Sequence, residues 1–139
     1  MKYYIVIPSY NEEALIGLTL QSLISQTVLP SKIVVVNDNS TDRTAEVVLE
    51  FAKNNPYISL VNKSSENIHL PGSKVIQAFE KGFETLDDNY DLIVKIDADL
   101  IFPTNYFETI IKHFQSDERI GMVGGFCYIE KNGEWILEN

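Results

Sequence analysis

Two aspartates separated by a single residue follow an apolar run in the second half of the chain. Asp97 and Asp99 come directly after Val94 and Ile96, with only Ala98 between them. In an extended chain, residues two apart point to the same side, so these carboxylates would converge on one point. Like charges that close repel, and a carboxylate is rarely buried without a partner. A divalent cation would satisfy both aspartates, while local turns and caps are the structural alternative.

The residues around this pair narrow the choice of metal. Carboxylate oxygens suit Mg²⁺ or Mn²⁺, and Mg²⁺ takes its remaining ligands from water and substrate phosphates. No cysteine or histidine accompanies the pair, which disfavours zinc. His69 and His113 stand alone in the sequence, and we expect both on the surface. The pair therefore predicts a Mg²⁺ or Mn²⁺ site, formed by Asp97 and Asp99, beside a phosphorylated ligand.

Two further polar clusters also follow apolar runs: "PSYNEE" (8–13) and "NDNSTD" (37–42). Such clusters most often make turns and caps, and a capping box between Ser9 and Glu12 would account for Glu12. A ligand-binding interpretation is also open. Tyr10 could stack on a nucleobase, and Asp38, an acceptor when ionised, could take the imide N–H of uracil, thymine or guanine. Asp97 could then reach the ribose hydroxyls.

The elements that must position these residues alternate along the chain. Continuous apolar runs predict strands at 3–8, 32–37, 57–61, 91–96 and 120–129. Helical periodicity lies between them, with apolar faces that share a 3.6-residue spacing. These faces are Ile16, Leu20, Leu23 and Ile24; Val48, Phe51 and Ala52; Ile76, Phe79, Phe83 and Leu86; and Phe107, Ile110, Ile111 and Phe114. The alternation predicts one α/β domain over residues 1–139, with a mostly parallel sheet and helices on both faces. Ligands of such sheets bind beyond the carboxyl ends of the strands.

Composition excludes several classes of partner. The 139 residues carry a net charge of −9, which argues against nucleic acid and against electrostatic docking on anionic lipid. No apolar run approaches the ~20 residues that cross a bilayer, so we expect no membrane segment. The single Cys127 favours a cytoplasmic location. Neither a dinucleotide-binding glycine fingerprint, nor a P-loop, nor a nucleophile elbow occurs in the sequence.

Five segments in order resemble the start of a family 2 glycosyltransferase with the Rossmann-like GT-A fold. They are "VIPSYNEEALIGLTLQSLISQT" (6–27), "VVVNDNSTDRTAEVV" (34–48), "QAFEKGFE" (77–84), "YDLIVKIDADLIFPTNYFE" (90–108) and "VGG" (123–125). The resemblance implies that Pro8, Tyr10, Glu12 and Asp38 line a nucleoside pocket. It also implies that Asp97–Ala98–Asp99 is the D-x-D metal motif, and that Lys74 lies near a basic position beside the phosphates. Glu80 departs from the family, which often has Asn there.

The resemblance also implies an activity: metal-dependent, inverting transfer of a sugar from a UDP-, dTDP- or GDP-linked donor to a hydroxyl of a saccharide or lipid-linked acceptor. Residues 1–103 match the donor-binding half, and 104–139 match an incomplete start of the acceptor half. The general base is expected beyond Asn139, because Glu130, Glu134 and Glu138 come too early. In a longer protein, a peripheral position at the inner membrane face would be compatible with this activity.

Three alternatives remain open at this point. A binding module with an intact donor site and no base would share every motif described above. A nucleotidyltransferase would share the architecture but usually opens with a glycine-rich, basic first loop, which "IPSYNEE" is not. A phosphoacceptor receiver domain would need an aspartate after the third strand, which here ends "LVNKSS".

Overall fold

The computed structural model of the chain describes residues 1–64 and 73–138. Strands and helices alternate through the first four strands, as the sequence predicts. The elements in chain order are β1 (Tyr3–Ser9), α1 (Ile16–Ile24), β2 (Lys32–Asp38), α2 (Thr44–Asn54), β3 (Ile58–Lys63), α3 (Ser73–Phe83), β4 (Leu92–Lys95), α4 (Tyr106–Ser116), β5 (Tyr128–Lys131) and β6 (Glu134–Leu137).

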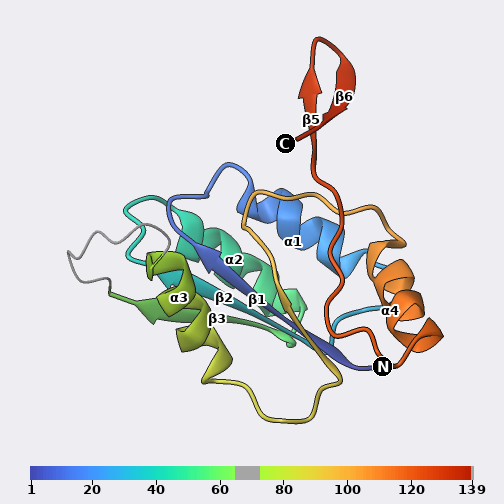
Figure 1. Cartoon of the computed structure of the whole chain (residues 1–139). Coiled ribbons are helices and arrows are strands. Elements are labelled where there is room, and N and C mark those ends of the chain that lie inside the picture. The colour runs from blue at the N-terminus through green and yellow to red at the C-terminus, as the bar shows by residue number, and fades with distance from the viewer. Residues whose placement is uncertain (65–72, 139) are drawn as a thin grey trace.

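The first four strands form one parallel sheet in the order β3-β2-β1-β4 (Figure 1). Val6 pairs with Val34 in the neighbouring β2 and with Lys95 in β4, so β1 lies in the interior of the sheet. Because all four strands run the same way, the segments that follow β1, β2 and β4 emerge at one edge. The predicted parallel α/β fold is confirmed.

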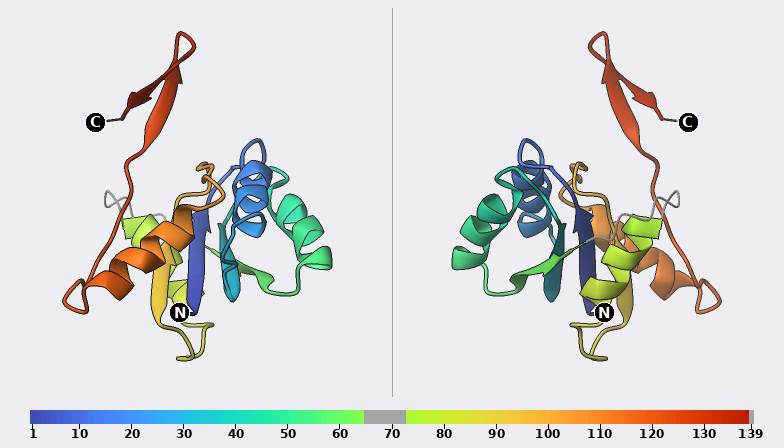
Figure 2. Two further views of the ribbon diagram at one scale, coloured as in Figure 1. Left: turned by 90° about the vertical axis from the view of Figure 1, so that its right-hand side faces the viewer. Right: turned by 90° about the vertical axis from the view of Figure 1, so that its left-hand side faces the viewer.

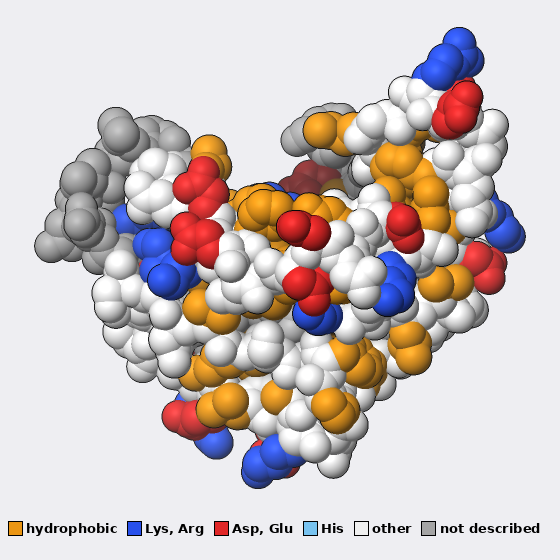
Figure 3. Space-filling model, turned by 90° about the horizontal axis from the view of Figure 1, so that it is seen from below, with side chains coloured by type: hydrophobic (Ala, Val, Ile, Leu, Met, Phe, Trp, Pro, Cys, Tyr) orange, Lys and Arg blue, Asp and Glu red, His pale blue; other side chains and the backbone are white. Residues whose placement is uncertain are grey.

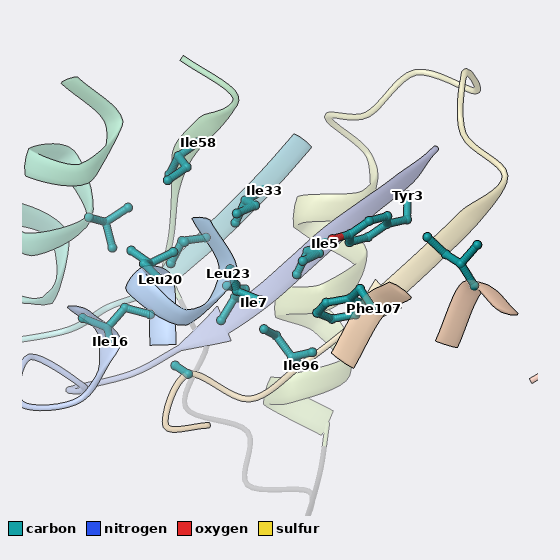
Figure 4. Packing of buried hydrophobic residues seen from close by; sticks show 14 residues of the cluster. Tyr3, Ile5, Ile7, Ile16, Leu20, Leu23, Ile33, Ile58, Ile96 and Phe107 are labelled. Carbon is teal, nitrogen blue, oxygen red and sulfur yellow. The ribbon is translucent and has the colours of Figure 1, made fainter. Parts of the chain in front are cut away.

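Helices cover both faces of this sheet, with α1 and α2 on one side and α3 on the other (Figure 2). The main core lies on the first side, where side chains of α1 meet those of β1 and β2, and where Phe107 of α4 stacks on Tyr3 (Figure 4). A smaller core of Val6, Val34, Val36 and Ala78 lies beneath α3. None of the helices in the described part of the chain is long and apolar enough to cross a membrane.

The predicted apolar face of α3 is confirmed for Phe79 and Leu86, which pack against the smaller core, and is wrong for its other two residues. Ile76 and Phe83, expected in the core, are 58% and 39% exposed, while Ala78 and Gly82 are buried. A Cβ built on Gly82 would lie 2.7 Å from side-chain atoms of both Val6 and Val36. The helix backbone therefore approaches the sheet too closely for larger side chains, so Ile76 and Phe83 point elsewhere.

This close approach predicts opposite effects for two glycine-to-alanine substitutions. In a helix, alanine is normally favoured over glycine by roughly 0.5–1 kcal/mol. Gly17→Ala should show that gain, because its Cβ would meet Val47 and Phe51 at ordinary contact distances of 3.5 and 3.6 Å. Gly82→Ala should instead destabilise the fold by about 1–3 kcal/mol through overpacking against the valines. Urea unfolding of both variants measures the two signs, and a stabilised Gly82→Ala would show that α3 is free to shift outwards.

The predicted strand over 120–129 is wrong for all but its last two residues, which begin β5. Residues 121–127 form no regular strand, and Met122 and Phe126 are largely exposed. Three glycines at 121, 124 and 125 weaken any strand there. Beyond them, β5 and β6 pair antiparallel in a hairpin apart from the main sheet (Figure 1). Asn132 and Gly133 both have positive φ at its turn, a sequence signal that hydrophobicity alone does not use.

Charge is spread over the surface visible from below. On this face, lysine and arginine side chains lie scattered among acidic and hydrophobic ones and form no continuous basic patch (Figure 3).

Candidate functional site

A cavity of about 620 Å³ opens at the sheet edge where the segments after β1, β2 and β4 emerge. Its walls include every residue that the sequence nominated for donor or metal binding: Pro8, Tyr10, Glu12, Asp38, Lys74, Asp97 and Asp99. The rest of the lining consists of residues that the sequence analysis did not assign to the site: Ser9, Asn39, Thr41, Val75, Ala78 and Ala98. Residues up to 91 positions apart thus share one wall. Lys74 and Val75 belong to the first turn of α3, so the positive end of that helix faces the same cavity.

A larger hollow of about 890 Å³ runs along β4 and α4. Its lining is mainly apolar, with Ile93, Phe102, Phe107 and Ile110 among its residues. It shares only Asp97 with the smaller cavity, and it gathers no comparable set of polar side chains. The chemistry of the lining therefore favours the smaller cavity as the functional site.

Much of the polar content of the first two loops serves to hold them together. The Asn11 N–H donates to Ser40 Oγ at 3.0 Å, and the Thr41 N–H donates back to Asn11 Oδ1 at 2.8 Å. The Glu13 N–H donates to Asp42 Oδ2 at 3.1 Å. For Asn11, Ser40 and Asp42, the turn-and-cap interpretation is therefore sufficient. These bonds fix the loops that carry Tyr10, Glu12 and Asp38 into the cavity.

The capping box that would have explained Glu12 is absent. Helix α1 begins at Ile16 with no side-chain cap, and Ser9 Oγ donates to the Val36 carbonyl instead. The Glu12 N–H donates to Thr44 Oγ1 at 2.9 Å, and Glu12 is part of the cavity lining. Burial raises the pKa of this carboxyl above its usual value, and the charges of Asp99, Asp42 and Asp97 raise it further. The cavity is thus a site of concentrated negative charge.

Tyr10 and Asp38 lie in the cavity with very different exposure. Tyr10 is 60% exposed, so its side chain is available to a ligand. The Asp38 side chain is only 9% exposed, and its Oδ1 lies 3.8 Å from Nζ of Lys63 at the end of β3. Sequence reasoning missed Lys63. The available signal was its place two positions beyond the predicted strand 57–61, next in the chain after the predicted strand 32–37 that Asp38 follows.

The segment that carries the two aspartates alternates between core and solvent. Ile96 and Ala98 are buried, while Asp97 and Asp99 face outwards into the cavity. Thr19 of α1, itself fully buried, donates to the Ala98 carbonyl at 3.0 Å. The backbone between the two carboxylates is therefore anchored directly to α1.

Ser22 of α1 and Gln26, two residues beyond the end of that helix, extend this anchor. Ser22 Oγ accepts the Phe102 N–H at 3.1 Å. The Gln26 amide accepts the Phe107 N–H at 3.1 Å and donates to the Pro103 carbonyl at 2.6 Å. Thr19, Ser22 and Gln26 thus form a polar stripe that holds residues 98–107 in place. The apolar pattern of α1 gave no indication of it.

Comparison with known proteins agrees with this arrangement. Residues 4–138 match the model of the family described as "Glycosyl transferase family 2". The chain belongs to glycosyltransferase family 2. Among curated relatives, the family 2 chain is 27% identical over 135 residues to the uncharacterized glycosyltransferase YibD of Escherichia coli, covering 96% of the chain and 37% of YibD. It is 32% identical over 126 residues to the probable glycosyltransferase YdaM of Bacillus subtilis, covering 89% of the chain and 29% of YdaM. The chain therefore spans about a third of these relatives' length.

Solved structures show the same fold. The mannosyltransferase PcManGT of Pyrobaculum calidifontis, in complex with GDP-Man and Mn²⁺, superimposes on the family 2 chain with a TM-score of 0.69 at 23% identity, covering 86% of the chain and 34% of PcManGT. S. aureus TarS 1–349, in complex with UDP, gives a TM-score of 0.63 at 23% identity, covering 84% of the chain and 32% of TarS. The GT-A fold expected from the sequence is confirmed.

Asp97 and Asp99 could hold a metal in this family 2 chain, because both are exposed and both line the cavity. In the described ranges, no three side chains of His, Cys, Asp and Glu gather into a complete metal-binding cluster. Two exposed carboxylates that leave other positions to phosphate and water fit Mg²⁺ or Mn²⁺ and not zinc. Lys95 Nζ lies 3.6 Å from Asp97 Oδ1 and partly balances its charge. His113 is exposed on α4, and His69 lies outside the described residues.

The acidic residues near the end of the chain lie outside the lining of the cavity. Glu130 is on β5, Glu134 is on β6, and Glu138 follows that strand; all three are exposed on the hairpin. None of them lines the cavity that holds Asp97 and Asp99.

Proposed function

We propose that this chain is the donor-binding part of a metal-dependent glycosyltransferase that takes a nucleotide-diphosphate sugar. The observation that carries the proposal is the cavity itself, where an exposed aromatic ring, a buried carboxylate, a lysine and two outward-facing aspartates meet. In our proposal, Pro8, Tyr10, Glu12, Asp38, Lys74 and Asp97 bind the nucleotide, and Asp97 with Asp99 holds Mn²⁺ or Mg²⁺. Residues 1–103 form the donor-binding half, and 104–139 begin the acceptor half.

Each part of the donor has a counterpart in the wall. The base stacks on the exposed ring of Tyr10, and its imide N–H donates to Asp38. The diphosphate lies between Lys74, at the positive end of α3, and the metal-holding aspartates. The net negative charge of the aspartates and Glu12 would repel a diphosphate, and a bound divalent cation reverses that repulsion.

In the transfer reaction, the task of this half of the protein is to bind the diphosphate and the metal. When bound, the metal supplies Lewis-acid stabilisation of the departing diphosphate. Asp99 and Asp97 orient the diphosphate through that charge, and Lys74 adds a fixed positive charge beside it. Attack of an acceptor hydroxyl on the anomeric carbon in a single displacement inverts that carbon, and it requires a general base. We place that base beyond Asn139, because Glu130, Glu134 and Glu138 lie on the hairpin.

The known relatives support this assignment of ligands. Solved complexes of similar proteins include TarS with UDP, TarS with UDP-GlcNAc, and PcManGT with GDP-Man and Mn²⁺. Uracil and guanine both carry the imide N–H that Asp38 would accept. Similar proteins named chondroitin synthase and hyaluronan synthase point to a saccharide acceptor, and a lipid-linked one serves the same chemistry. The single cysteine suits a cytoplasmic location for the reaction.

Replacing Tyr10 tests whether a base stacks in the cavity. Losing a base–aromatic stack costs about 1–3 kcal/mol, so Tyr10→Ala should weaken UDP binding by ~5- to 150-fold in calorimetry with Mn²⁺. Because Tyr10 is 60% exposed, the melting temperature of the Tyr10→Ala variant should differ little from that of the wild-type chain. Tyr128→Ala is the matched control, since Tyr128 is 54% exposed and lies on the hairpin. Equal UDP affinity in the two variants would mean that the base does not stack on Tyr10.

A further inference from the structure

Asp38 and Lys63 form a cross-strand ion pair at the end of the sheet. Their side chains are 9% and 14% exposed, respectively, and 3.8 Å separates Asp38 Oδ1 from Lys63 Nζ. The two residues are register partners in the last rung of the β2–β3 ladder. One rung earlier, the Asn37 amide donates to Asn62 Oδ1 at 3.0 Å, which fixes the relative position of the two strand ends.

The alternation of side chains places the pair on the face of the sheet that α3 covers. Val34 and Val36 pack beneath α3, so Asp38, two positions further on, points to the same side. Val61 also packs there, and Lys63 continues its face in the same way. The pair thus lies at the floor of the cavity. Asp38 is part of the lining, and Lys63 lies behind it, outside the lining.

A largely buried ion pair needs a reason beyond stability. Removing two charges from water is expensive, and replacing such a pair with apolar residues is often neutral or stabilising. A merely structural strand end would be served better by two valines, like the Val36·Val61 rung two positions earlier on the same face. Only Asp38 faces the cavity, so the pair makes sense if the function of the site needs a carboxylate there.

We propose that Lys63 is a positioning residue that sets the base preference of the site by holding the Asp38 carboxylate. This inference rests on the proposed function, in which Asp38 accepts the imide N–H of the base. With one oxygen held towards Lys63, the carboxylate presents acceptor atoms and no donor to the cavity. Uracil, thymine and guanine offer a ring N–H at that point, whereas cytosine and adenine offer a ring acceptor that a carboxylate repels. Lys63 therefore acts on selectivity through Asp38 without touching the nucleotide.

The experiment compares UDP with CDP rather than measuring one affinity. A charge-assisted hydrogen bond left unmade changes affinity by ~5- to 150-fold, which is the preference for UDP expected of the wild-type chain. Lys63→Met should bring the ratio of the two affinities close to one, and Lys63→Arg should keep most of the preference. Lys74→Met also removes one positive charge, but from the cavity wall. It should therefore weaken the binding of UDP and of CDP equally and leave the ratio of their affinities unchanged. If Lys63→Met does not fold, Lys63→Gln removes the charge and keeps a polar group.

The possible outcomes separate the two levels of the proposal. A wild-type chain that binds UDP and CDP equally removes Asp38 from base recognition, and with it both the base assignment and the role of Lys63. A wild-type preference that survives in Lys63→Met, or in Lys63→Gln in its place, overturns only the role of Lys63. A variant that melts lower but keeps the UDP-to-CDP ratio would show that the pair is structural. Loss of the ratio with rescue in Lys63→Arg supports the positioning role.

Discussion

UDP should bind this chain tightly only with Mn²⁺ or Mg²⁺, and Asp99→Asn should remove that dependence. In the described part of the chain, Asp99 forms no ion pair, and its carboxylate faces a cavity already crowded by Asp97 and Glu12. Losing an outer-shell partner of a metal typically costs ~10- to 100-fold, and a direct ligand should cost at least as much. Calorimetric titration of UDP, with Mn²⁺ and with EDTA, measures the difference in wild type and variant.

The same substitution should have the opposite effect on the protein without ligand. Asn keeps the shape of Asp99 and removes one charge, so repulsion with Asp97 and Glu12 falls and the melting temperature should stay level or rise. Asp88→Asn is a matched control, because Asp88 is exposed on the loop before β4, at the other end of the sheet. It should leave both the melt and the metal dependence unchanged. The contrary outcome has two parts: without ligand, Asp99→Asn melts at a lower temperature than wild type, and with Mn²⁺ and UDP its melting temperature rises by as much as that of wild type. That outcome would show that Asp99 serves the fold and holds no metal.

The sequence was a good guide to the parallel sheet because its signal is local. Runs such as "YIVIP" and "IVVV" are apolar throughout, and only strands covered on both faces need that pattern. The carboxyl edge then follows from geometry, since parallel strands bring their ends together. Tyr10, Asp38 and Asp99 could therefore be nominated for one site before their positions were known.

Predictions that depended on contacts between residues far apart in the sequence were less accurate. Ile76 and Phe83 were wrongly assigned to the buried face of α3, because hydrophobicity cannot show that Gly82 lies against Val6 and Val36. The segment 120–129 has strand-like residues, but strand formation needs a partner to pair with, and in this structure only residues from 128 onwards find one. Thr19 and Lys63 were missed because each acts on a residue in another element, Ala98 and Asp38.

The second large effect concerns the choice of base. Asp38→Asn replaces an acceptor-only carboxylate with an amide that can both donate and accept. Cytosine carries a ring acceptor beside an amino group, so the amide can pair with it, whereas the imide of uracil loses its charged acceptor. We expect UDP to lose ~5- to 150-fold in affinity and CDP to gain, which reverses the order of the two nucleotides. Parallel titrations of both, with Mn²⁺ present throughout, give the ratio.

Asp38→Ala serves as the comparison that separates recognition from damage. It removes donor and acceptor together, so the affinity for UDP should fall. The affinity for CDP should rise only by the amount that comes from removing the repulsive carboxylate. Both variants leave Lys63 largely buried without Asp38, and breaking such a pair costs about 3–5 kcal/mol, so the titrations must be run well below the melting temperature of each variant. Because both variants share that cost, only the amide of Asn can account for a CDP affinity that is higher in Asp38→Asn than in Asp38→Ala. Equal CDP affinity in the two would place the ring edge of the base away from residue 38.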